Sequence, residues 1–92
     1  MPTLVADPPF VEKLTAALRS RLEKAGLNVD VSSEPVHFTK LYRFYVVSRN
    51  FKAMGQQERQ KLVWHIVENV LSADEQLHVS MILTVTPDDL GH

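Results

Sequence analysis

Four histidines, His37, His65, His78 and His92, are the side chains of this sequence best suited to bind a metal ion, because the chain contains no cysteine. The lack of cysteine excludes disulfides, thiolate nucleophiles and cysteine-ligated metal sites built from this chain alone. Any metal site must therefore use imidazoles and carboxylates, or take some of its ligands from a partner.

His78 stands at the entrance of an alternating segment, LHVSMILTV, that is typical of a β-strand. The alternation predicts a core-facing row of Leu77, Val79, Met81, Leu83 and Val85, and the opposite face for His78, Ser80, Ile82, Thr84 and Thr86. An imidazole beside rigid backbone suits a metal ligand or a pH-sensitive contact. A lone histidine at such a position is more often a half-exposed residue without a task, so position alone assigns no function.

His37 lies in an expected loop, residues 33–40, between the first two strands. This loop could approach the end of the sheet where His78 stands, which would bring together two ligands of an incomplete site. The alternative is a solvated loop residue. His65 and Glu68 are one helical turn apart without an HExxH pattern, so we interpret them as surface residues.

Arg59 is unusual because it is a cation near the start of a predicted helix, residues 56–72, where it opposes the helix dipole by about 0.3–1 kcal/mol. It continues the apolar stripe of that helix, so we expect either a buried carboxylate partner or an external anion, unless the neighbouring Glu58 simply offsets its charge. Lys61 and Arg43 could join it in a small basic surface.

Composition excludes several classes of function. The net charge of −1 gives no overall field that would attract nucleic acid. The sequence has no nucleophile elbow and no glycine-rich phosphate loop, so we do not expect an autonomous enzyme. No apolar run approaches the roughly 18 residues of a membrane span, and MPTLVADPPF does not read as a secretory signal. A cytoplasmic protein is the default expectation.

The 92 residues, 45% apolar and 23% charged, predict one globular domain with an ordered core at about residues 8–87. The expected elements are a helix at 8–25 capped by Asp7 and ended by Gly26, a strand at 27–32, a strand at 41–48, the helix at 56–72, a polar connection at 73–76, a strand at 77–86 and a loose tail.

This α-β-β-α-β order predicts a two-layer α+β fold. The first two strands should pair antiparallel across their loop, and a right-handed helical crossover should make the last two parallel. Both helices would then cover one face of a three-stranded mixed sheet, with strand 41–48 in its centre.

Three stretches, VVSRNF, ERQKLVWHIVENVL and LHVSMILTVTP, resemble the BolA-like proteins, clearly over residues 41–88 and more loosely through LNVDVSS. The resemblance implies a KH-like fold, binding to a monothiol glutaredoxin, and a shared [2Fe–2S] cluster for iron trafficking or iron sensing. Some bacterial members regulate transcription. The family histidine that opens the last strand falls on His78, and the second ligand would fall on His37.

The sequence departs from the family pattern at several positions. The family's Arg-His-Arg element is Arg59-Gln60-Lys61 here, and its His-Ala-Leu is His78-Val79-Ser80. The family's Ser-His-Phe corresponds either to Val36-His37-Phe38 or to Lys40-Leu41-Tyr42, which leaves the role of His37 open.

A [2Fe–2S] cluster needs four ligands, and this chain offers at most two, both nitrogen. The resemblance therefore implies that a glutaredoxin cysteine and glutathione complete the site, while Arg59, Lys61 and Arg43 belong to the partner surface. Alone, the chain would be a cofactor-free monomer or weak homodimer. The alternative hypothesis is a KH-like nucleic-acid-binding regulator that uses helix 56–72 and loop 49–55, although the GXXG loop of that class is absent.

Overall fold

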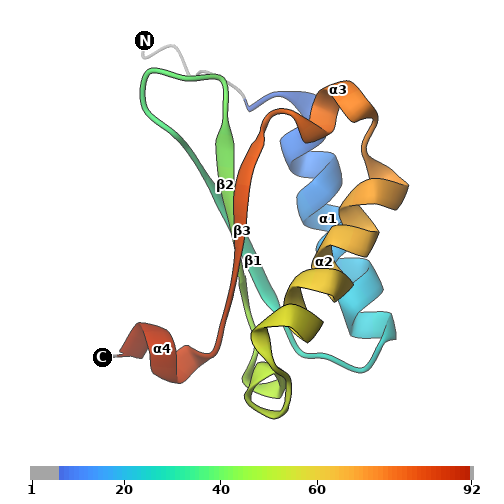
Figure 1. Cartoon of the computed structure of the whole chain (residues 1–92), viewed down its shortest axis with the longest axis vertical. Coiled ribbons are helices and arrows are strands. Elements are labelled where there is room, and N and C mark those ends of the chain that lie inside the picture. Colours follow the sequence, from blue (N-terminus) through green and yellow to red (C-terminus); the bar gives the residue numbers. More distant parts are fainter. Residues whose placement is uncertain (1–6, 92) are drawn as a thin grey trace, which may run out of the picture.

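The computed structural model describes residues 7–91, so residues 1–6 and the candidate ligand His92 lie outside it. Figure 1 shows a twisted sheet with two long helices packed against one of its faces. The elements in chain order are α1 (Pro9–Lys24), β1 (Asp30–Pro35), β2 (Tyr42–Val47), the 3-10 helix η1 (Arg49–Ala53), α2 (Gln56–Val70), α3 (Ala73–Gln76), β3 (Val79–Val85) and α4 (Pro87–Gly91).

The sheet has the predicted topology. Its strand order is β1-β2-β3, with β1 and β2 antiparallel and β2 and β3 parallel. The expected α+β class, the central place of β2 and the helices on one face are thus confirmed.

The helix α1 buries the apolar stripe that its sequence spacing indicates, namely Phe10, Val11, Leu14, Leu18 and Leu22. Gly26 has a φ of 92°, a left-handed conformation that glycine adopts without a steric penalty, and it ends the helix as predicted. The predicted cap is wrong. Pro8 occupies the N-cap position without a side-chain bond, and the carboxylate of Asp7 instead accepts a hydrogen bond from the hydroxyl of Tyr42 at 3.2 Å.

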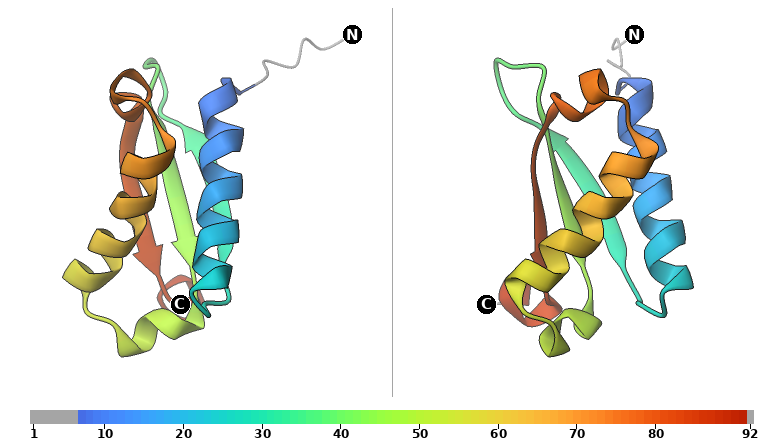
Figure 2. Two further views of the ribbon diagram at one scale, coloured as in Figure 1. Left: turned by 90° about the vertical axis from the view of Figure 1, so that its right-hand side faces the viewer. Right: turned by 45° about the vertical axis from the view of Figure 1, so that its right-hand side comes forward.

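The helices α1 and α2 lie side by side over the sheet (Figure 2). From α2, Val63, Ile66 and Val67 are buried, and they meet Phe44 of β2 and Phe51 of η1 in one hydrophobic core. The chain therefore builds a two-layer domain around one core.

The core face predicted for β3 is wrong over most of the strand. Leu77 precedes β3, where it ends α3, and is 73% exposed. Within β3, Met81 is 43% exposed, whereas Ile82 is buried. The reason is a β-bulge. Tyr42 pairs with Val79 but the next residue of β2 pairs with Met81, so one extra residue of β3 reverses the faces that follow. Thr84 and Thr86 are consequently buried.

Several boundaries also differ from the expectations. The strand expected at 27–32 lies at Asp30–Pro35, loop 49–55 contains η1, and connection 73–76 is the short helix α3. The tail expected to be loose forms α4, whose start is fixed by two hydrogen bonds: the amide of Thr86 donates to the carboxylate of Asp89, and the amide of Asp89 donates to the hydroxyl of Thr86. This reciprocal pattern resembles a capping box.

No helix within residues 7–91 has the length and hydropathy that crossing a membrane requires.

Candidate functional site

A cavity of about 510 Å³ lies where the start of α1, the turn between β1 and β2, and α3 meet. Its apolar walls include Pro8, Phe10 and Tyr42, and its polar lining includes Lys40 and His78. These residues are far apart in the sequence, and the fold brings them together at one end of the sheet. A concave, mostly apolar surface with a few polar groups is the usual form of a binding site.

The imidazole of His78 is held in one orientation at this cavity. Its Nδ1 lies 3.1 Å from the backbone carbonyl oxygen of Asp74. A carbonyl oxygen can only accept, so Nδ1 must carry the proton in this hydrogen bond. The neutral ring then presents the lone pair of Nε2, which is the form that binds a metal ion.

Two further contacts fix the position of His78. Its ring packs against the ring of Phe10, with 5.9 Å between the centroids. Its backbone carbonyl accepts a hydrogen bond of 2.8 Å from the amide of Tyr42, the first residue of β2. His78 lies directly before β3, and its ring packs against Phe10 of α1 rather than on the sheet face opposite the helices, where the alternation predicts it.

The helix α3 that presents the Asp74 carbonyl is itself held by a capping box. The hydroxyl of Ser72 accepts from the amide of Glu75 at 3.2 Å, and the carboxylate of Glu75 accepts from the amide of Ser72 at 2.8 Å. Lys13 of α1 adds an ion pair of 3.0 Å to the same carboxylate. These contacts, the Ser72 amide first and Lys13 second, lower the pKa of Glu75. The His78 orientation thus depends on α1 as well as on α3.

The aromatic wall of the cavity was not predicted from the sequence. Phe10 and Tyr42 meet edge to face, with 5.8 Å between centroids and an interplanar angle of 86°. Desolvation first, and then the neighbouring Asp7 carboxylate, raises the pKa of the Tyr42 hydroxyl. The helical spacing of the sequence places Phe10 on the core-facing stripe of α1, but periodicity does not tell which end of that stripe borders a cavity. The segment Ser72-Ala-Asp-Glu75 did carry a readable capping-box signal.

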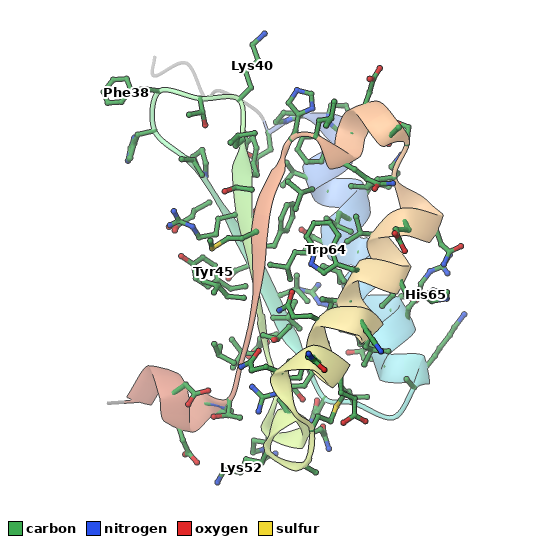
Figure 3. All side chains as sticks on the ribbon, viewed as in Figure 1. Phe38, Lys40, Tyr45, Lys52, Trp64 and His65 are labelled. Carbon is green, nitrogen blue, oxygen red and sulfur yellow. The ribbon has the colours of Figure 1, made fainter. Side chains whose placement is uncertain are left out.

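His37 lies in the turn between β1 and β2 and is exposed. Its neighbour Phe38 has a φ of 65° and a fully exposed side chain, and Figure 3 shows Phe38 and Lys40 at this turn. The turn reaches the cavity through Thr39 and Lys40, but His37 is not among the residues that line it. Within residues 7–91, no group of three or more His, Asp or Glu side chains could hold a metal ion. Among the residues that line the cavity, His78 is the one imidazole, and Asp74 and Glu75 are the carboxylates beside it.

His65 is exposed on α2, as expected, and it lies away from the β1–β2 turn that carries Phe38 (Figure 3). Its backbone carbonyl accepts a hydrogen bond from the side chain of Asn69. Nothing in its surroundings gives it a role at the cavity.

Among residues 7–91, Arg59 forms no ion pair with a carboxylate, so the buried carboxylate partner that its position suggested is not found. Its side chain is buried, and its guanidinium donates to three backbone carbonyls: Met54 at 3.0 Å, Thr84 at 3.1 Å, and Phe51. It also stacks over the ring of Phe51 at 5.4 Å. Arg59 therefore joins η1, α2 and β3 and is removed from the expected partner surface.

The other two residues of the expected basic surface lie apart. Arg43 is half-buried on the open face of the sheet and forms an ion pair of 2.8 Å with Glu34. The hydroxyl of Tyr45 donates to the same carboxylate, and these two contacts, Tyr45 first, lower the pKa of Glu34. Lys61 is exposed on α2. The structure does not assemble Arg43, Arg59 and Lys61 into one cationic surface.

Comparison with known proteins identifies no family model that matches this chain and no matching curated protein. The functional argument consequently rests on the residues around the cavity and their geometry.

Proposed function

We propose that this protein is a BolA-like adaptor that binds a monothiol glutaredoxin in the cytoplasm and supplies His78 to a [2Fe–2S] cluster shared between the two proteins. The observation that carries the proposal is the hydrogen bond from Nδ1 of His78 to the carbonyl of Asp74, which leaves Nε2 free to bind iron. The biological task would be iron–sulfur trafficking or iron sensing.

The donor chemistry of the chain supports a shared site. The sequence has no cysteine, and His78 is an isolated imidazole at the cavity, so this chain suits one position of a four-ligand cluster. The remaining ligands would be the glutaredoxin cysteine, a glutathione thiolate and a further donor. Bound through an imidazole, the cluster would have a raised reduction potential compared with all-thiolate ligation.

The cavity beside His78 supplies a docking surface for the partner. Its apolar wall can bury an apolar group of the partner, and Lys40 at its lining can contact a carboxylate such as those of glutathione. Because α3 is capped and clamped by Lys13, the histidine is held in position before binding.

The test is a mixing experiment with cluster-loaded monothiol glutaredoxin and glutathione, followed by visible absorption and circular dichroism. The wild-type chain should change both spectra, and His78→Ala should abolish the change. The matched control is His65→Ala, which removes an exposed imidazole on α2 and should behave as wild type. Spectra that stay unchanged with the wild-type chain, or that still change with His78→Ala, would overturn the proposal.

His37→Ala in the same experiment decides whether the second imidazole is a ligand. Spectra that match those of the wild-type complex would show that His37 is not a ligand of the cluster. A spectrum that differs from both wild type and His78→Ala would assign His37 to the cluster, which requires the turn to close over the cavity.

A further inference from the structure

A second surface hollow, with a volume of about 750 Å³, lies between α1 and α2 on the outer side of the helix layer. Three small side chains of α1, Ala16, Ala17 and Ser20, form one part of it, and Leu62 and Ile66 of α2 form another. We call this hollow the α1–α2 groove. It is distinct from the cavity at His78, and no residue lines both.

The two charged side chains that line the α1–α2 groove, Arg21 and Lys24 of α1, are both cationic, and no Asp or Glu lines it. Ser20 of α1 and the imidazole of His65 on α2 add polar groups. Arg21, Lys24 and His65 are all exposed. Within the described part of the chain, the ion pairs are Lys13–Glu75, Arg43–Glu34 and Lys52–Asp88, so neither Arg21 nor Lys24 is neutralised by a carboxylate.

This concentration of positive charge is local. The whole chain has a net charge of −1, and the acidic residues of α2, Glu58 and Glu68, do not line the groove. A cationic groove on a slightly acidic protein favours a partner whose negative charge is confined to one side. An extended polyanion would also meet the negative charges elsewhere on the surface.

The small residues decide the shape of the partner. Ala16, Ala17 and Ser20 recur at one- to four-residue spacing on α1, and their short side chains allow another backbone to approach closely. The apolar part is the half-buried Leu62, with the buried Ile66 beneath it, and it can take an apolar residue of an amphipathic helix, as in helix-in-groove recognition. The flanks of such a helix would then meet Arg21, Lys24 and His65.

We infer that the α1–α2 groove binds an acidic amphipathic helix of a partner protein, with its apolar stripe against the helix pair and its carboxylates against Arg21, Lys24 and His65. This second docking surface lies outside the His78 cavity, so it could be occupied while a cluster-carrying partner is bound. The inference does not depend on the proposed function.

The probe is a fluorescein-labelled, end-capped helical peptide with leucine and alanine on one face and glutamate on both flanks. Fluorescence anisotropy at low salt measures its affinity for the full chain, and amide NMR shifts locate its site. We expect saturable binding with shifts along α1 and α2, and weakening of about tenfold or more for the double variant Arg21→Glu/Lys24→Glu. The matched control is Arg49→Glu/Lys52→Glu, which makes the same charge change on η1 and should bind as wild type.

Arg21 and Lys24 also stand in the last turn of α1, so charge reversal could weaken the fold. The double variant Arg21→Gln/Lys24→Gln removes both charges without reversing them. It should therefore keep the fold and still weaken binding of the peptide by severalfold.

The inference would be overturned by any of these results: no saturable binding of the peptide, equal binding of a scrambled peptide of the same composition, shifts on the open face of the sheet, or equal loss of affinity in the η1 control. Tighter binding of a DNA duplex to the same groove would also overturn it, by assigning the groove to a different class of partner. None of these measurements uses glutaredoxin, so failure here leaves the proposed function untouched.

Discussion

At the scale of single residues, backbone carbonyls decide the roles of the two side chains that stand out in the sequence. Arg59 donates from Nε and both terminal nitrogens to three carbonyls, which leaves its charge engaged inside the protein. His78 gives only one nitrogen to a carbonyl, that of Asp74. Arg59 is thus a structural cation, whereas His78 retains a free donor atom.

The first residue-scale prediction concerns the tautomer of His78. At about pH 8.5, where an ordinary imidazole is neutral, the ring should carry its proton on Nδ1 because the Asp74 carbonyl accepts it. Long-range proton–nitrogen NMR correlation distinguishes the two nitrogens. His37 and His65 serve as internal controls, since both are exposed, and they should show mainly the Nε2 tautomer of free histidine. A proton found on Nε2 of His78 would contradict the ligand-ready geometry.

The second residue-scale prediction is that Arg59→Met lowers the free energy of unfolding by about 3 kcal/mol. The variant keeps much of the side-chain volume but leaves the carbonyls of Phe51 and Thr84 buried without their donor, at about 1–3 kcal/mol each. Urea denaturation measures the change. Lys61→Met, two residues along the same helix and exposed, should stay within about 0.5 kcal/mol of wild type. Equal stability of the two variants would show that the buried guanidinium is not required.

At the scale of elements, the short helix α3 links the helix layer to His78. A helix of four residues has little stability of its own, so its caps and its contact with α1 must hold it. The caps are the reciprocal Ser72–Glu75 bonds, and the contact is the Lys13–Glu75 ion pair. The direction of the Asp74 carbonyl, and with it the His78 ring, follows from these bonds.

Ser72→Ala tests this dependence. Removing the cap should lower the free energy of unfolding by about 1 kcal/mol and speed amide exchange in α3. It should also weaken the hydrogen bond that fixes the His78 tautomer. Ser80→Ala removes an exposed hydroxyl from β3 and should change stability by less than about 0.5 kcal/mol. If Ser72→Ala leaves the amide-exchange rates in α3 unchanged, the capping box does not hold this helix in place.

The elements show which features the sequence can predict. The stripes of α1 and α2, Gly26 as the end of α1, and the order of the strands all follow from local periodicity and chain connectivity, and the structure confirms them. The faces of β3 cannot be predicted in this way, because the bulge near Ser80 depends on how β3 pairs with β2. A pairing irregularity of that kind leaves the alternating pattern of β3 unchanged, so periodicity alone cannot reveal it.

In the candidate site, too, local features can be predicted from the sequence, whereas contacts between elements cannot. His78 was identified because its position at a strand entrance is a local property of the sequence. Its partners Phe10 and Asp74 come from other elements, and the partners of Arg59 are backbone carbonyls that no side-chain pattern encodes.

At the scale of the whole molecule, one face of the sheet is covered by helices and the other is open (Figure 1). The free edge of β3 is nevertheless protected. The Val85 carbonyl accepts from the Ser48 amide, so by alternation the carbonyls of Ile82 and Thr84 point away from β2. They accept from Gln60 at 2.9 Å and from Arg59 at 3.1 Å. These bonds occupy acceptors that another strand would need and so disfavour edge-to-edge association.

The stability of the whole molecule should fall in acid partly through Glu75, which joins α3 to α1. Its pKa is lowered from 4.5 by the Ser72 amide and Lys13, so the folded state favours the ionised form. That contribution is fully present above pH 4.5 and is lost as the pH falls through the lowered value. Glu75→Gln should therefore be less stable than wild type at neutral pH and lose less stability between about pH 5 and 3.

Urea denaturation of both proteins across this pH range measures the difference. The control is Glu23→Gln, which removes an exposed carboxylate that takes no part in the Lys13–Glu75 ion pair. Its loss of stability between about pH 5 and 3 should equal that of wild type. The carboxylates of Glu34 and Asp89 also have lowered pKa values, so the Glu75→Gln protein should keep part of its acid sensitivity. Parallel stability curves for wild type and Glu75→Gln would mean that the clamp between α1 and α3 does not contribute, and the fixed orientation of His78 would then need another cause.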